Sequence, residues 1–208
     1  MDYLRDRTVC RSLLVILLLL LTACTRRQVG SILPEGCRLQ TGDVVLRCGA
    51  GMLSHAVLLA EGDEGTYSHV GIVVDSSGVA MIVHAVPDEP DYEGDPDRVK
   101  MEKPEKFYHA MMAKQGAVLR HRDSVAAKRA AAKAMEVYRR HTLFDHDYND
   151  HDTTRMYCTE LITFAFSSTG APLSGIESHR LPLPGVDYAC VLPSDIFECS
   201  DFRLIISF

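Results

Sequence analysis

The alternation of apolar and polar residues predicts strands at several places along the chain. These segments are short, rich in β-branched residues and bounded by glycine, serine or aspartate, as is typical of strands in an antiparallel sheet. They comprise residues 43–48, 69–75, 79–85, 117–122 and 202–208. The second and third are separated by Ser76, Ser77 and Gly78 only, which predicts a β-hairpin.

Longer apolar patterns predict helices. Residues 49–60 are small and apolar and predict a short helix, and residues 124–141 are rich in strong helix formers, with Ser124 as the expected cap. Residues 157–169 are apolar around most of the helix circumference, which predicts a buried helix that stops at Gly170. The sum is an α+β fold: an antiparallel sheet packed against a buried helix.

The N-terminus has a different pattern. Basic residues precede an unbroken apolar run at 13–21, and small residues then lead to Cys24. This order is typical of a secretory signal, and the run is short for a transmembrane helix. The end of the segment resembles a bacterial lipobox, which implies cleavage before Cys24 and lipidation of its thiol. An uncleaved anchor helix is the alternative.

The organisation that follows is a signal peptide over 1–23, a tether over 24–40 and one domain over 41–208. The 208 residues suffice for one domain with its own core. Both readings of the N-terminus place the domain in the cell envelope, beside a bacterial membrane. Thr25, rather than aspartate, follows Cys24, which in a Gram-negative cell would indicate the outer membrane.

Charge and cysteine content narrow the function classes. The net charge of −6 argues against a nucleic-acid partner, because phosphate binding needs a basic surface. Outside the signal segment and Cys24, five of the seven cysteines remain, so at least one is unpaired or bonds another chain. Two disulfides could form among four of them, and their pairing is open: Cys37, Cys48, Cys190 and Cys199.

Cys158 is the candidate nucleophile. It lies in the first turn of the predicted buried helix, where free backbone N–H groups carry partial positive charge. That field stabilises a thiolate and is expected to lower the thiol pKa, and the same N–H groups can stabilise an oxyanion. The alternative is a small cysteine that only packs in the core.

Two histidines are candidate partners for this thiol. His69 begins the first strand of the hairpin and His84 ends the second, so the hairpin should bring both to the same end of the sheet. A histidine base needs a third group that fixes its tautomer, and His84 could supply it.

Four stretches together resemble a known superfamily. They are residues 42–47, residues 54–62, Tyr-Ser-His-Val-Gly-Ile-Val-Val at 67–74 and Tyr-Cys-Thr-Glu-Leu-Ile at 157–162. They resemble the circularly permuted branch of the NlpC-type papain-like cysteine peptidases, the YaeF/YiiX group, which is related in topology to lecithin:retinol acyltransferase. The histidine precedes the cysteine here, as in the permuted branch.

The resemblance implies a permuted papain-like fold in which the buried helix carries the catalytic cysteine. It assigns Cys158 as nucleophile, His69 as base and His84 as the third member. Tyr67 resembles a tyrosine near the base of related enzymes, which implies a role at the oxyanion hole; a packing role is the alternative.

An acidic segment precedes the cysteine helix. Residues 145–152 are rich in aspartate and histidine but lack the glycine and closing glutamate of a calcium loop, so no metal and no cofactor is predicted. The segment is expected to line the cleft, with Asp147 and Tyr148 contacting substrate. Glu160 lies two positions after the nucleophile and points elsewhere on a helix, which favours a capping role for it.

The leading hypothesis is a lipid-anchored cysteine hydrolase that cleaves an amide bond in cell-wall or other small peptides, through a thiolate and an acyl-enzyme. A lipid-directed thioester-forming acyltransferase or esterase would use the same cysteine and histidine. A noncatalytic binding lipoprotein is the third class. The expected partners are a peptide or peptidoglycan-derived substrate and a membrane.

Overall fold

A computed structural model describes residues 30–49, 52–61, 66–149, 152–180 and 189–208. Residues 31–208 form one unit, and residues 1–30 are assigned to another. The expected signal peptide, Cys24 and the first part of the tether lie outside the described residues. Within the described residues, no helix combines the length and the apolar character needed to cross a membrane.

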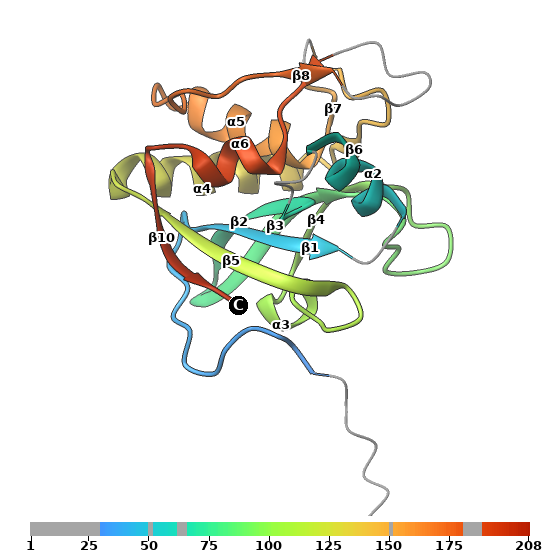
Figure 1. Ribbon diagram of the computed structural model, residues 1–208, viewed down its shortest axis with the longest axis horizontal. Helices are drawn as coiled ribbons and strands as arrows, with labels where there is room; N and C mark the ends of the chain where they lie inside the picture. Colours follow the sequence, from blue (N-terminus) through green and yellow to red (C-terminus); the bar gives the residue numbers. More distant parts are fainter. Residues whose placement is uncertain (1–29, 50–51, 62–65, 150–151, 181–188) are drawn as a thin grey trace, which may run out of the picture. The chain divides into compact units, whose positions relative to one another are not determined.

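The secondary structure is mixed, with strands in the majority (Figure 1). The strands are β1 (Val44–Gly49), β2 (His69–Ser76), β3 (Val79–Val86), β4 (Arg98–Glu102), β5 (Ala113–His121), β6 (Leu143–Phe144), β7 (Arg155–Met156), β8 (His179–Arg180), β9 (Ala189–Cys190) and β10 (Phe202–Ser207). The helices are α2 (Met52–Glu61), α3 (Pro104–Phe107), α4 (Ser124–Arg139), α5 (Cys158–Ser167) and α6 (Pro193–Glu198).

Eight strands form one sheet in the order β10-β5-β1-β2-β3-β4-β6-β7. Every neighbouring pair is antiparallel except β6 and β7. The β2–β3 hairpin is confirmed, and its recorded pairs run from Ser76–Val79 to Ile72–Val83. These pairs stop short of His69 and Val86, so the two strands diverge where β2 begins.

The sheet separates two hydrophobic cores, because successive side chains of a strand point to opposite faces. Val70, Ile72 and Val74 of β2 join the larger core, which also contains side chains of α4, α5 and α6. Val73 joins the smaller core with Phe107 at the end of α3. Figure 1 accordingly shows α4, α5 and α6 on one side of the sheet and α3 on the other.

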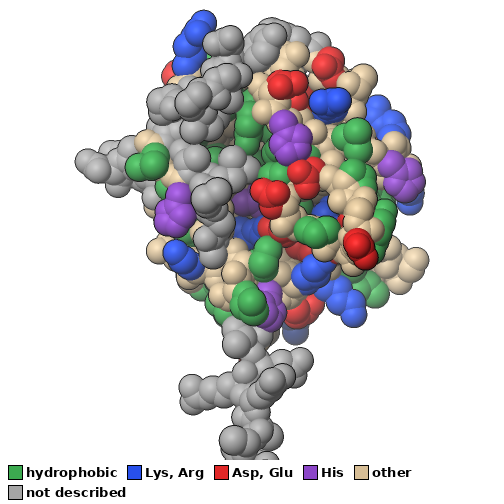
Figure 2. Space-filling view, turned by 90° about the vertical axis from the view of Figure 1, so that its right-hand side faces the viewer, with side chains coloured by type: hydrophobic (Ala, Val, Ile, Leu, Met, Phe, Trp, Pro, Cys, Tyr) green, Lys and Arg blue, Asp and Glu red, His purple; other side chains and the backbone are tan. Residues whose placement is uncertain are grey.

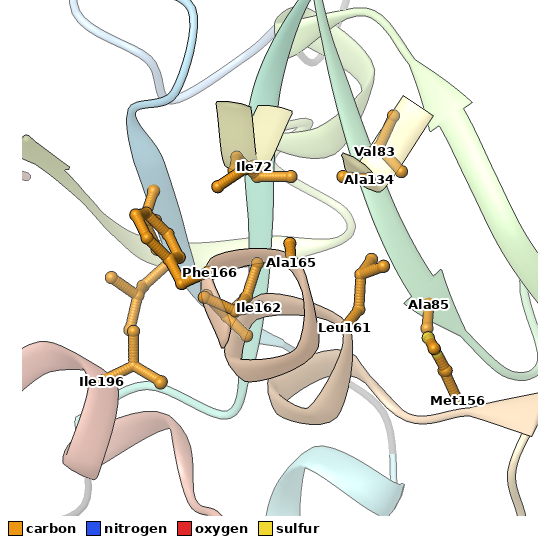
Figure 3. Packing of buried hydrophobic residues seen from close by; sticks show 14 of the residues in the cluster. Ile72, Val83, Ala85, Ala134, Met156, Leu161, Ile162, Ala165, Phe166 and Ile196 are labelled. Carbon is orange, nitrogen blue, oxygen red and sulfur yellow. The ribbon is translucent and has the colours of Figure 1, made fainter. Parts of the chain in front are cut away.

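Helix α5 is buried, as its apolar circumference predicts. Figure 3 shows its side chains packed against the sheet and the neighbouring helices; they are Leu161, Ile162, Ala165 and Phe166. Ile72 of β2 and Val83 of β3 meet them from the sheet. This packing fixes the position of the first residue of α5, which is Cys158.

The last part of the expected tether lies against the domain. The backbone N–H of Ile32 donates to the carbonyl oxygen of Tyr108 at 2.8 Å. Leu33, Cys37 and Leu39 pack against the smaller core. Residues 31–40 therefore belong to the folded unit and not to a free-standing linker.

Candidate active site

Cys158 begins α5 at the place where β2 and β3 diverge. Its thiol lies beside the backbone N–H of Val70, the residue that follows His69, and beside the N–H groups of Thr159 and of Cys158 itself. Within the described part of the chain, the thiol makes no recorded hydrogen bond to either imidazole. Catalytic hydrogen bonds are often long before substrate binds, so this placement is compatible with a reacting pair.

His69 and His84 are in direct contact. Nε2 of His69 lies 2.8 Å from Nδ1 of His84, and the side chains are 7% and 0% exposed. The hairpin thus brings the two histidines together, as its geometry predicts. Both rings also contact the ring of Phe107, at centroid distances of 5.7 Å and 5.3 Å. They therefore lie on the face of the smaller core.

Burial has the largest effect on the pKa values of the Cys158 thiol and the His69 imidazole. Although Cys158 keeps some exposed surface, burial raises the pKa of its thiol to about 11, and the three backbone N–H groups and the charge of Arg47 lower it by less. The expectation of a low thiol pKa at the helix N-terminus is therefore wrong for this state. Burial, Arg47 and His84 hold the pKa of His69 well below its usual range.

Arg47 is a buried charge that the sequence interpretation missed. It pairs with His69 across β1 and β2, and its guanidinium donates to the carbonyl oxygen of Phe107 at 2.9 Å. The guanidinium also lies over the Phe107 ring and pairs with Glu89. Arg47 is a charged residue in the otherwise apolar strand β1, and this pattern was the sequence feature that could have identified it.

Glu102 of β4 also went unnoticed. Its Oε1 lies 3.2 Å from Nε2 of His84, and the side chain is almost fully buried. The atoms are within ion-pair distance, although the alignment falls short of a well-directed hydrogen bond. Burial raises the pKa of Glu102, but the contact with His84 and the charges of His84, Arg47 and Lys106 outweigh it and bring the pKa to about 2.

The tyrosine expected at the oxyanion hole lies in a packing environment. Tyr67 is buried, and its ring contacts that of Phe197 at a centroid distance of 5.0 Å. Burial and the nearby Cys48 raise the pKa of its hydroxyl. Its role at the oxyanion stays a prediction, whereas the packing alternative has visible partners.

The acidic segment reaches the site through Tyr148. Its ring lies 5.4 Å from that of Tyr157, which directly precedes Cys158, and burial and Cys158 raise the pKa of its hydroxyl. Its backbone φ is +54°, a left-handed conformation that is rare outside glycine. The buried carboxylate of Asp145 holds this turn by accepting from the N–H groups of Asp147 and Asn149. The side chain of Asp147 itself is exposed.

Several other expectations can be compared with the structure. The carboxylate of Glu160 accepts from the N–H of Tyr157 at 3.2 Å, so its capping role is confirmed. Three of the cysteines that could have formed disulfides carry free thiols instead: Cys37, Cys48 and Cys199. No group of three or more histidine, cysteine, aspartate or glutamate side chains suited to a metal ion occurs among the described residues.

Comparison with known proteins supports the fold. No known family profile and no curated protein sequence matches the chain. Among solved structures, it is similar to the crystal structure of the metalloprotein YiiX from Escherichia coli O157:H7, with a TM-score of 0.64 and 19% identity. The match covers 83% of this chain and 99% of that chain. The chain thus has a YiiX-like α+β fold.

Proposed function

We propose that the protein is a cysteine hydrolase of papain-like type, with Cys158 as nucleophile and His69 as general base. The observations that carry the proposal are the buried contact between Nε2 of His69 and Nδ1 of His84, and the Cys158 thiol beside the backbone N–H of Val70, the residue after His69. A histidine whose Nε2 is held by another group can offer Nδ1 to a thiol. The YiiX-like fold and the permuted order of histidine and cysteine support the same assignment.

The raised thiol pKa and the lowered imidazole pKa determine the resting state: both groups are neutral near pH 7. Attack on a carbonyl carbon then requires the thiol proton to move to Nδ1 of His69 as the sulfur–carbon bond forms. The imidazolium next gives that proton to the leaving amine, and water hydrolyses the resulting thioester. The backbone N–H groups of Cys158 and Thr159, which lie beside the thiol, are proposed to stabilise the oxyanion.

The substrate is proposed to be a small peptide that carries a free amine, such as a cell-wall peptide. Figure 2 shows acidic side chains and histidines close together on one face of the protein, with basic side chains among them. The exposed Asp147 and the site-facing Tyr148 belong to the segment proposed to bind this substrate. A lipid anchor at Cys24 would keep the enzyme at the envelope membrane where such peptides occur.

A substrate panel tests this function. The full-length protein in detergent is assayed on small peptide amides and on acyl esters, with Cys199→Ala as a control for loss of a thiol outside the site. We expect Cys158-dependent cleavage of amides, loss of turnover in Cys158→Ala and retention in Cys199→Ala. Turnover confined to acyl esters would favour the lipid-directed alternative. Full turnover by Cys158→Ala would reject the cysteine-hydrolase proposal.

A further inference from the structure

Three buried side chains form a line behind the proposed base. Nε2 of His69 meets Nδ1 of His84 at 2.8 Å, and Nε2 of His84 meets Oε1 of Glu102 at 3.2 Å. The side chain of Glu102 is 4% exposed and that of His84 is fully buried. A carboxylate with so little access to water requires compensating partners, and His84 is one of them.

The sheet register places Glu102 in this line. Strands β3 and β4 pair so that His84 lies opposite Lys100 and Ile82 lies opposite Glu102. Residues two apart on one strand share a face, so Glu102 is the diagonal neighbour of His84 on the face of the smaller core. The contact therefore follows from the pairing of two regular strands.

The other carboxylate oxygen of Glu102 contacts Lys106. Oε2 of Glu102 lies 3.2 Å from Nζ of Lys106, whose Nζ also contacts Asp91 at 2.6 Å. Lys106 is about half exposed, so it connects the buried line to the surface. With Lys106 beside one oxygen and His84 beside the other, both at ion-pair distance, the ionised form of Glu102 is favoured, and that form can only accept hydrogen bonds.

The Glu102 carboxylate determines which ring nitrogen of a neutral His84, and then of His69, carries the hydrogen. A carboxylate only accepts, so Nε2 of His84 must carry a hydrogen. In a neutral imidazole the other nitrogen is then an acceptor, and Nδ1 of His84 can bond Nε2 of His69 only if that atom carries a hydrogen. Nδ1 of His69 is then left with a free lone pair. The opposite arrangement would protonate Nδ1 and remove the base.

We infer that Glu102 is a positioning residue that, through His84, fixes His69 in the tautomer whose unprotonated Nδ1 can accept the thiol proton of Cys158. This inference rests on the proposed function for its catalytic consequence. Its structural content is the protonation pattern of two histidines, which can be measured without any substrate.

The first test is the imidazole nitrogen spectrum of the full-length protein in detergent, labelled with ¹⁵N-histidine. We expect His69 and His84 both to carry the hydrogen on Nε2 and neither to carry one on Nδ1. Signals are assigned by their disappearance in His69→Gln and His84→Gln. A hydrogen on Nδ1 of either ring would overturn the inference. This measurement uses the unchanged protein, so it decides the question even if a Glu102 variant does not fold.

The second test reverses the direction of the hydrogen bonds between Glu102, His84 and His69 by replacing one carboxylate oxygen with an amide –NH₂. In Glu102→Gln, Lys106 should draw the amide oxygen, which turns the amide –NH₂ towards His84 and makes it a donor. Both histidines would then switch tautomer, and Nδ1 of His69 would be protonated. We expect turnover to fall by up to about 10⁴-fold, the scale of a wrong-tautomer effect in the Ser-His-Asp triad.

A compensating change provides the matched control. Adding Lys106→Met to Glu102→Gln removes the donor that orients the amide, so the amide oxygen can face His84 again, and we expect recovery of about tenfold or more. Adding Lys133→Met, on the exposed side of α4, should restore nothing. Wild-type turnover by Glu102→Gln, or equal recovery in both double variants, would contradict the inference. Absence of Cys158-dependent turnover in the unchanged protein would instead reject the proposed function and leave the tautomer measurement to decide the role of Glu102.

Discussion

At the scale of single residues, the thiol of Cys158 is subject to two opposing influences. The N–H groups at the start of α5 and the charge of Arg47 favour the thiolate, while burial favours the neutral thiol. Burial has the larger effect and raises the pKa to about 11. A substrate that delivers its carbonyl to these N–H groups would replace part of the missing solvation, so activation is expected to accompany binding and not to precede it.

Alkylation kinetics can measure this pKa. The rate at which iodoacetamide modifies the Cys158 peptide, followed by mass spectrometry from pH 6 to pH 11, should keep rising to the end of the range. Free cysteine, with a thiol pKa of about 8.5, is the reference and should level off earlier. A Cys158 rate that is already constant at neutral pH would show a preformed thiolate and contradict the burial argument.

A graded series of variants tests the two histidines. Cys158→Ala removes the nucleophile and should abolish turnover. His69→Ala removes the base and should lower turnover by about 10²- to 10⁴-fold. His84→Gln keeps a hydrogen-bonding group beside Nε2 of His69, so we expect a smaller loss, measured as kcat/KM on the same substrates. Equal activity of His84→Gln and the wild type would remove His84 from the proposed triad.

The sequence pattern identified the candidate cysteine and histidines of the site, but not the charged residues that surround them. Cys158 and His69 stand at the starts of elements, His84 lies near the end of β3, and the hairpin brings the two histidines together. Arg47 lies inside β1 and Glu102 ends β4, at positions where a charge ordinarily indicates a solvent-facing side chain. Only the register of four neighbouring strands, β1 to β4, reveals that these charges are buried against the histidines, and register over that distance is not visible in a local pattern.

At the scale of elements, the apolar periodicity located β1, β2, β3, β10, α4 and α5 closely, and it placed β5 with a late start. It missed β4 and α6. Strand β4, Arg98–Glu102, alternates charged and apolar residues, and its charged side chains are partly or fully buried by ion pairs with neighbouring segments. Glu102 lies in β4, so the alternation of charged and apolar residues that hid this strand also hid the carboxylate.

The start of α4 provides a stability prediction. Ser124 was expected to cap this helix, but the structure begins the helix at Ser124 and uses Asp123 as the cap. The Asp123 carboxylate accepts from the N–H groups of Val125 and Ala126 at 2.8 Å and 3.1 Å. Asp123→Ala should therefore lower the free energy of unfolding by about 1 kcal/mol, measured by urea denaturation.

Ser124→Ala is the matched control for that variant, because Ser124 is already inside the helix and alanine is a better helix former. It should leave the free energy of unfolding nearly unchanged or raise it slightly. A larger loss from Ser124→Ala than from Asp123→Ala would return the capping role to the serine.

At the scale of the whole molecule, the N-terminal segment determines where the chemistry would take place. Cys24 lies outside the described residues, so the lipid anchor stays a prediction from the lipobox-like sequence. Cys24→Ser should prevent lipidation and release the protein from membranes or misdirect it, as followed by cell fractionation and intact-mass analysis. Unchanged membrane association of Cys24→Ser, with residues 1–23 retained, would favour the uncleaved anchor helix.

The central claim is that Cys158 carries the acyl group of the substrate during turnover, and trapping that intermediate tests it most directly. The full-length protein is mixed with a peptide amide or acyl ester that it turns over, quenched in acid within one turnover and analysed by peptide mass spectrometry. We predict that the peptide containing Cys158 gains the mass of the acyl group, loses it on longer incubation, and gains far less of it in His69→Ala at the same time point. Acylation of a different residue, or undiminished turnover with no adduct on Cys158, would contradict the account.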